Sequence, residues 1–343
     1  MAQYGGGSRE RPEARRGRRR GGAGHARYAG EVTDPHRDSG PVSPASDATA
    51  APDRADDLAL ALRLADAADA ISVERFRSAD LHVSVKPDRT PVTDADQAVE
   101  RAVRAIVARE RPDDVVLGEE YGGSDGGSDA HAGSADATGS HAHAGSAGHA
   151  GSADAGGGPA RRGRQWIVDP IDGTANFLRG VPVWATLVSL VVDGVPVVGV
   201  VSAPALGRRW WASQGAGAFS DESPTTPLRV SGVAALADAS LSYNGLEYWR
   251  EGGRLDELLS LTERVWRTRA YGEFWSYCMV AEGVLDVAGE DGLSPWDMAA
   301  VQIVVEEAGG AFTSLDGAPG PWHGSALASN GLLHDEVVRA VGR

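Results

Sequence analysis

The sequence predicts an α/β protein with one large ordered region. Two observations indicate this. Segments with strand-like and helix-like patterns alternate through the second half of the chain. Glycine is concentrated outside the expected ordered region: residues 1–54 and 122–163, both low in complexity, hold 22 of the 45 glycines. The remaining residues contain all nine tryptophans and suffice for one large domain or two small ones.

The segment before residue 122 predicts two helices. Apolar residues at helical spacing indicate one from Ala55 to about Arg77 and another between Thr93 and Pro112. Short strands are expected at 82–85 and 115–117, and prolines mark the loop at 86–91.

The segment after residue 163 predicts strands first and then alternating elements. Three buried strands are expected at 166–168, 184–192 and 195–202, the last two joined by the turn Asp193-Gly194, and a hairpin follows over 210–219. Further strands at 239–243, 267–270, 285–288 and 310–314 alternate with helices at 254–265, 276–282 and 295–308. This alternation is typical of an α/β arrangement.

Charge and composition exclude several classes of protein. The net charge is −15 although residues 1–30 carry eight Arg against two Glu, so the rest is strongly acidic. An acidic body does not suit binding to a phosphate backbone, and we expect small ligands and cations rather than nucleic acid. No apolar run reaches the roughly 18 residues of a membrane helix, so no membrane partner is expected. A single cysteine, Cys278, fits a reducing compartment, and we expect the cytoplasm.

The two low-complexity stretches are interpreted as additions to the ordered region. Arginines at 15–20 suit contact with RNA or anionic lipid, but a solvated extension is favoured. The stretch 122–163 repeats His-Ala-Gly-Ser-Ala, and its four histidines suggest a metal-binding tract. An inserted linker is favoured, because flexible chain loses much conformational entropy when it closes around an ion.

The most informative motif is Asp169-Pro170-Ile171-Asp172-Gly173-Thr174. Pro170 fixes one φ and Gly173 permits a tight turn, so that Asp169, the Ile171 carbonyl and Asp172 can converge. Oxygen ligands of this kind suit Mg²⁺. The backbone N–H groups of Gly173 and Thr174, at the start of a following helix, would form a phosphate cradle. Neighbouring metal and phosphate sites indicate phosphoryl chemistry.

Three further acids lie at chain turns. Asp96 and Asp297 begin helices and Glu119 ends a strand, so each also has an ordinary interpretation as a helix cap or a surface acid. Together these carboxylates would repel one another unless cations lay between them.

Three motifs at these positions resemble the inositol-monophosphatase-like family in order and spacing. They are 118–120, 166–177 and 296–300, and the resemblance covers nearly all of 56–343 except the insert. It implies a layered α-β-α-β-α sandwich that hydrolyses phosphate monoesters with Mg²⁺, is inhibited by lithium and is usually a homodimer. We therefore expect a disordered extension at 1–54, an α+β metal-binding half at 55–205 containing the loop 122–163, and an α/β substrate half at 206–343.

The resemblance also implies roles for the acids. Glu119, Asp169 and the Ile171 carbonyl would hold one ion, and Asp169, Asp172 and Asp297 a second; a third ion near Glu119 is left open. Asp96 and Thr174 would orient and deprotonate the attacking water, so that Asp96, Thr174 and Glu119 are the catalytic candidates. Gly173 and Thr174 would hold the phosphate.

Within the family, the stretches 179–186, 202–212 and 271–277 resemble the histidinol-phosphate phosphatase branch. Histidinol phosphate carries an ammonium group and an imidazole, which acids and aromatic faces accommodate. The expected substrate contacts are Glu290, Glu273, Phe274, Trp275 and Asp297. Ordinary core packing is the alternative for the aromatic residues.

The other functions left open are an inositol-1-phosphate phosphatase, a broader sugar or nucleotide monophosphatase, and an idle family member recruited through its basic tail.

Overall fold

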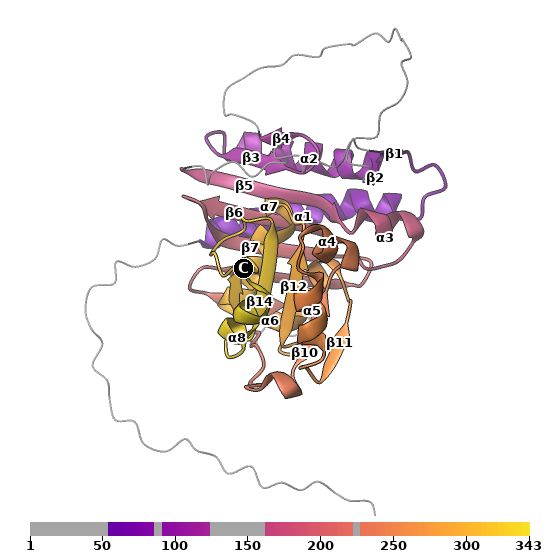
Figure 1. Ribbon diagram of the computed structural model, residues 1–343. Coiled ribbons are helices and arrows are strands. Elements are labelled where there is room, and N and C mark those ends of the chain that lie inside the picture. The colour runs from indigo at the N-terminus through magenta and orange to yellow at the C-terminus, as the bar shows by residue number, and fades with distance from the viewer. Residues whose placement is uncertain (1–53, 86–90, 124–161, 222–226) are drawn as a thin grey trace, which may run out of the picture. The chain divides into compact units, whose positions relative to one another are not determined.

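The computed structural model describes residues 54–85, 91–123, 162–221 and 227–343 (Figure 1). These described residues belong to one compact unit. The expected N-terminal extension up to residue 53, almost all of the insert with its four histidines, and residues 86–90 of the expected loop lie outside the described residues. The expected division between residues 205 and 206 stays a prediction; one sheet continues past it to Ser220.

A seven-stranded sheet has the order β4-β3-β5-β6-β7-β8-β9. β3 pairs with β5 in parallel and the other pairs are antiparallel. The predicted Asp193-Gly194 turn joins β6 to β7, with Val192 opposite Val195. The strands are β3 (Val115–Gly118), β4 (Gly122–Gly123), β5 (Arg164–Asp172), β6 (Ala185–Val192), β7 (Val195–Ala203), β8 (Arg208–Ser213) and β9 (Gly217–Ser220).

Two helices, α1 (Ala55–Arg75) and α2 (Asp94–Glu110), cover one face of this sheet (Figure 1). Their buried residues, such as Leu64 and Val103, pack against Trp166, Val188 and Val200 of the sheet. In α2 the apolar stripe that predicted the helix is its buried face. In α1 the buried face contains Leu60 and Leu64, whereas Leu58 and Leu62, from which the helix was predicted, are half-buried.

The opposite face packs on α6 (Glu273–Ala281) and α7 (Pro295–Glu307), which also contact a second, five-stranded sheet. Its order is β11-β10-β12-β14-β13. The strands are β10 (Ser240–Tyr243), β11 (Arg267–Arg269), β12 (Val287–Asp291), β13 (Ala311–Thr313) and β14 (Ser325–Ser329).

The far face of the second sheet carries a third helical layer. It consists of α4 (Leu246–Glu251), α5 (Leu255–Thr262) and α8 (His334–Val341), whose apolar residues form one cluster with those of β10, β12 and β14. The expected α-β-α-β-α sandwich is thereby confirmed. Among the described residues, no helix has the length and apolar character that crossing a membrane requires.

Some elements differ from the prediction. α6 begins at Glu273 rather than Ser276, and β5 continues to Asp172 instead of ending at Val168. α4, β14 and α8 were not anticipated. The remaining short elements are β1 (Val83–Val85), β2 (Pro91–Thr93), α3 (Thr174–Arg179) and the 3₁₀ turn η1 (Leu236–Asp238).

Candidate active site

The end of β5 brings two acids to one point. In a regular strand, residues three apart face opposite sides of the sheet. Here the pairing with β6 is irregular between Asp169 and Asp172, and the buried Thr186 hydroxyl donates to the Pro170 carbonyl at 2.7 Å. One oxygen each from Asp169, Asp172 and Asp297 lies within 4.8 Å of the others. The proline that the sequence placed between the acids thus lies in the irregular segment that makes their convergence possible.

Backbone N–H groups orient two of these carboxylates. The N–H of Ser294 donates to Asp297 Oδ2 at 2.7 Å, at the start of α7. The N–H of Phe274 donates to Asp172 Oδ2 at 2.7 Å, at the start of α6. The capping role anticipated for Asp297 and its place in the acid cluster are therefore compatible.

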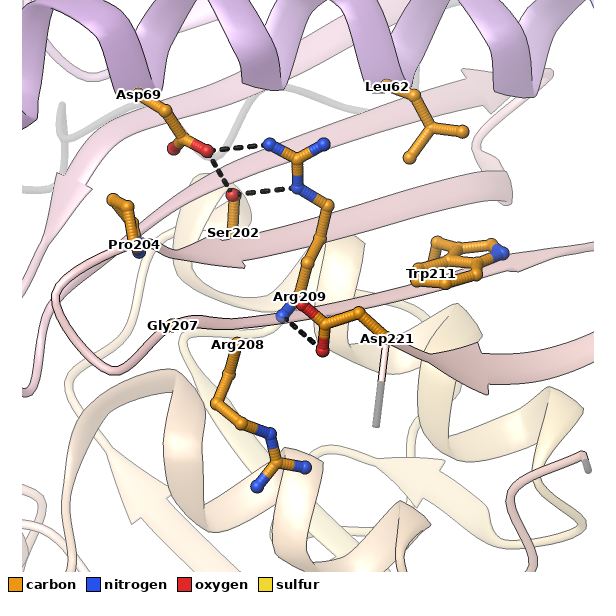
Figure 2. Close-up of a pocket in the computed structure, with 9 residues that line it drawn as sticks. All are labelled: Leu62, Asp69, Ser202, Pro204, Gly207, Arg208, Arg209, Trp211 and Asp221. Carbon is orange, nitrogen blue, oxygen red and sulfur yellow. Dashed lines mark hydrogen bonds and ion pairs between the residues drawn. The ribbon is translucent and has the colours of Figure 1, made fainter. Parts of the chain in front are cut away.

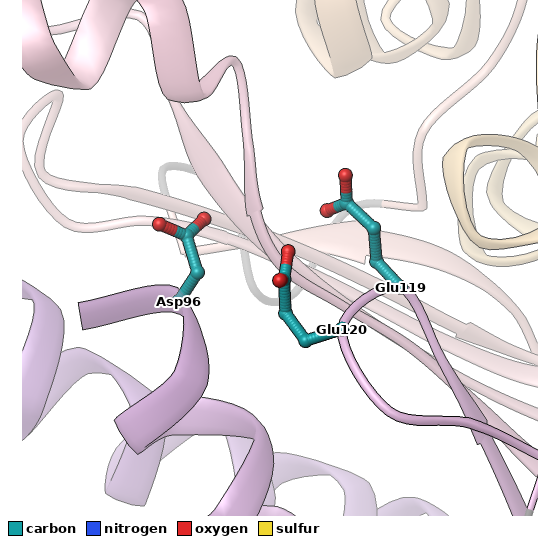
Figure 3. A group of neighbouring side chains, drawn as sticks. All are labelled: Asp96, Glu119 and Glu120. Carbon is teal, nitrogen blue, oxygen red and sulfur yellow. The ribbon is translucent and has the colours of Figure 1, made fainter. Parts of the chain in front are cut away.

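A second cluster contains Asp96, Glu119 and Glu120 (Figure 3). Asp96 comes from the start of α2, and the two glutamates come from the turn between β3 and β4. One oxygen from each lies within 4.8 Å of the others. No role for Glu120 was predicted from the sequence.

Asp96 is held between two threonines. Its Oδ2 accepts the hydroxyl of Thr93 at 2.5 Å and the N–H of Thr93 at 2.8 Å, which completes the anticipated capping box. Its Oδ1 lies 3.3 Å from the Thr174 hydroxyl, which also lies 3.0 Å from the Ile171 carbonyl. The expected pair, Asp96 and Thr174, is therefore within hydrogen-bond distance.

Gly173 precedes α3 with φ of 85°, a conformation that disfavours side chains. A Cβ there would lie 3.0 Å from the Val183 carbonyl oxygen and 3.3 Å from Glu273 Cγ. The bend at the predicted phosphate cradle therefore requires glycine, and it places Glu273 beside that cradle.

The expected substrate contacts occupy different environments. Glu290, in β12, is 3% exposed, and its Oε1 has no hydrogen-bond partner among the described residues. Trp275 is half-buried and meets Tyr271 edge-on. Phe274 is 1% exposed and packs against Trp210 in the core, as the alternative interpretation held. Its backbone, rather than its ring, reaches the acid cluster.

Burial raises the pKa of five acids that belong to the two clusters or lie near them. It raises the pKa of Asp96 to about 6, with a further contribution from the charge of Glu119. Burial first, and then neighbouring acids, hold the pKa values of Asp169 and Asp172 well above their usual range. Burial also raises the pKa of Glu273 to about 7 and, with the charge of Glu273, that of Glu290 to about 8.

These acids fit a divalent cation. Asp169 is 2% exposed, yet its Oδ1 has no hydrogen-bond partner among the described residues. A buried acceptor without a donor is costly, and carboxylates forced together repel one another. A cation would relieve both penalties, and an all-oxygen ligand set suits a hard ion.

The raised pKa values predict how the stability of the metal-free protein depends on pH. In the unfolded chain, Asp96, Glu273 and Glu290 release their protons at the ordinary carboxyl pKa. In the folded protein they keep these protons up to their raised pKa values. The free energy of unfolding then falls as pH rises through the folded pKa values. We expect Tm in EDTA to fall between about pH 5 and about pH 8, and excess Mg²⁺ to restore much of it. A Tm in EDTA that does not vary over this range would contradict the prediction.

Comparison with known proteins identifies the family. The sequence pattern of the inositol monophosphatase family matches residues 53–343. The chain belongs to this family. It is 53% identical to a histidinol-phosphatase of Mycobacterium tuberculosis over 82% of this chain and 96% of the relative, and 52% identical to a histidinol-phosphatase of Streptomyces coelicolor over 84% and 97%. Its fold is similar to the structure of a Thermotoga maritima IMPase, with a TM-score of 0.66 and 27% identity over 83% of this chain and 96% of that chain.

Membership of the inositol monophosphatase family confirms two predictions. The chain is a phosphoric monoester hydrolase, and the family is metal-dependent. The two acid clusters are the groups that suit a metal among the described residues.

A pocket away from these clusters lies beside α1, β7 and β8 (Figure 2). The Arg209 guanidinium donates to Asp69 at 2.6 Å, Asp66 at 2.7 Å and Ser202 at 2.9 Å. Its positive charge is already neutralised by acids, so we assign no anion site there. The lining residues are Leu62, Asp69, Ser202, Pro204, Gly207, Arg208, Arg209, Trp211 and Asp221.

Proposed function

We propose that the protein is a Mg²⁺-dependent phosphatase that hydrolyses L-histidinol phosphate to L-histidinol and phosphate. The observation that carries the chemistry is the aspartate cluster of Asp169, Asp172 and Asp297 beside the Asp96–Thr174 pair. The substrate is supported by the two histidinol-phosphatases that are 53% and 52% identical to this chain over the aligned residues.

Each group has a role in this proposal. Asp169, Asp172 and Asp297 would hold one Mg²⁺, and Glu119, Asp169 and the Ile171 carbonyl would hold another. Mg²⁺ held there would neutralise phosphoryl charge and promote ionisation of water. Asp96, oriented by Thr174, accepts the proton of the attacking water. The N–H groups of Gly173 and Thr174 bind the phosphoryl oxygens.

The substrate's amine end has a matching environment. Glu290 has a buried oxygen without a donor, and Glu273 lies beside the predicted phosphate cradle. An ammonium or imidazole N–H would supply the missing donor and favour the charged carboxylate. Inositol, which carries hydroxyl groups only, offers no such charge. Trp275 is half-buried and directly follows Phe274, whose N–H donates to Asp172.

A direct comparison of substrates tests this assignment. We expect kcat/KM for histidinol phosphate to exceed that for inositol 1-phosphate at least tenfold, a difference of about 1.4 kcal/mol, because only the former pairs with the acids. Phosphate release with Mg²⁺ measures both. Glu290→Gln should reduce the preference, while Glu263→Gln, on the surface after α5, should not.

Two outcomes would overturn the assignment. A higher kcat/KM for inositol 1-phosphate would favour the alternative of an inositol-phosphate or broader monophosphatase, which the family name and the IMPase structure also support. Release from no monoester by folded, Mg²⁺-loaded protein would favour an idle member recruited through its basic tail.

We also propose a cellular location, an oligomeric state and an inhibitor for the enzyme. We assign it to the cytoplasm as a homodimer inhibited by lithium, without nucleic-acid or membrane partners. The single, buried cysteine Cys278 and the acidic composition support this setting, and the homodimer and lithium inhibition follow from the family resemblance.

A further inference from the structure

The turn that carries Glu119 and Glu120 is contacted by a buried acid of α2. Glu100 is 0% exposed. Its Oε2 accepts the N–H of Glu120 at 2.7 Å, and its Oε1 lies 3.3 Å from the N–H of Tyr121. A side chain from the helix therefore receives two successive N–H groups of the turn.

One helical turn further on, Arg104 contacts the strands on either side of the same turn. Its Nε donates to Glu100 Oε1 at 2.8 Å, and its Nη1 lies 3.3 Å from the Val116 carbonyl. Its Nη2 donates to the Gly122 carbonyl. Glu100 thus binds donors of the turn while Arg104 binds the acceptors before and after it.

The approach of Glu100 depends on Gly118. A Cβ at Gly118 would overlap the Glu100 carboxylate. The glycine before the two glutamates therefore makes room for the acid that orients them.

A buried ion pair is a poor source of stability. Removing two charges from water costs several kcal/mol, and apolar residues of similar size often stabilise a protein as well or better. A carboxylate that accepts consecutive N–H groups does, however, fix the path of a turn, as partners of metal ligands commonly do.

We propose that Glu100 and Arg104 are positioning residues that hold the 118–122 turn so that the carboxylates of Glu119 and Glu120 face Asp96. The inference rests on the proposed metal-dependent function only for its effect on metal binding. The hydrogen bonds to the turn can be tested without metal or substrate.

The test compares Glu100→Gln with Glu110→Gln in the full chain. Glu110 lies on the same helix and forms ion pairs with Arg63 and Arg109. Three quantities are measured: Tm, hydrogen exchange of the Glu120 and Tyr121 amides by NMR in EDTA, and Mg²⁺ binding by calorimetry with Mg²⁺ alone. Metal-dependent phosphatase activity is measured alongside.

In Glu100→Gln we expect the two amides to exchange at least about tenfold faster and the Kd for Mg²⁺ to rise about tenfold, as for other partners of metal ligands. Glu110→Gln should change neither. High concentrations of Mg²⁺ fill the site even when binding is weaker. We therefore expect kcat of Glu100→Gln at saturating Mg²⁺ to approach that of the unaltered protein, while the apparent Kd for Mg²⁺ stays raised.

Unprotected Glu120 and Tyr121 amides in the unaltered protein would overturn the proposal even if Glu100→Gln does not fold. An unchanged Kd for Mg²⁺ in a folded Glu100→Gln variant with faster exchange would also overturn it, since the pair would then be structural only. If the unaltered protein binds Mg²⁺ but hydrolyses no phosphate ester, the proposed function fails while the exchange and binding results still decide the role of Glu100.

Discussion

Asp172→Asn is expected to lower kcat by at least about a thousandfold. Asp172 contributes to the cluster with Asp169 and Asp297, whose oxygens lie within 4.8 Å of one another. An amide in place of the carboxylate removes one negative charge and brings N–H donors towards a cation. The loss should appear mainly in kcat at saturating Mg²⁺, because the cation stabilises the charge that develops on the phosphoryl group in the transition state.

The fold should survive this substitution. The asparagine carbonyl can still accept the Phe274 N–H that Asp172 now accepts at 2.7 Å. Asp66→Asn provides the control, since Asp66 on α1 has a side chain 66% exposed and pairs with Arg209. Circular dichroism and phosphate release should show both variants folded and only Asp172→Asn inactive. Near-normal turnover of Asp172→Asn would show that the metal site lies elsewhere.

Helices and tight turns could be predicted from the sequence, because they depend on residues that are close together in the chain. The stripes of Leu and Ala in α1 and of Val in α2 are buried on one face, as the helical spacing requires. The Pro170–Gly173 segment likewise indicated a bend. Proline restricts the backbone and glycine widens its allowed conformations, whatever surrounds them. The acids of the clusters, apart from Glu120, could therefore be named as candidates before the fold was known.

Features that depend on contacts between distant segments of the chain were harder to predict from the sequence. Phe274 was expected at the substrate, but its ring packs against Trp210, more than sixty residues earlier in the chain. The positive φ of Glu273, at 48°, gives no local sequence signal, although it starts α6 beside Gly173. A side chain's direction in such cases is decided by packing between layers.

The same limit explains why Glu100 was missed. From the sequence it is one acid on an amphipathic helix, where acids usually face solvent. Its partners in the 118–122 turn become visible only when β3 pairs with β5 and α2 packs over the sheet. Thr93 illustrates the opposite case, because its capping box with Asp96 joins residues three apart and was anticipated.

Thr174→Val is expected to lower kcat by about a hundredfold to ten-thousandfold. Valine has nearly the shape of threonine but no hydroxyl, so the contacts to Asp96 at 3.3 Å and to the Ile171 carbonyl at 3.0 Å are lost. Asp96 stays attached to Thr93 through its other oxygen, so the carboxylate remains near the site but loses its orientation towards the water. The KM for the phosphate ester should change little, because the backbone N–H groups of Gly173 and Thr174 are unaffected.

Thr174→Ser separates this role from packing. Serine retains the hydroxyl and loses only a methyl group, so it should recover most of the kcat that Thr174→Val loses, with both variants folded by circular dichroism. Equal losses in the two variants would mean that the methyl group, and hence packing at the start of α3, is what matters. A large rise in KM with kcat unchanged would instead assign Thr174 to phosphate binding, and Asp96 would then lack the partner that makes it the base.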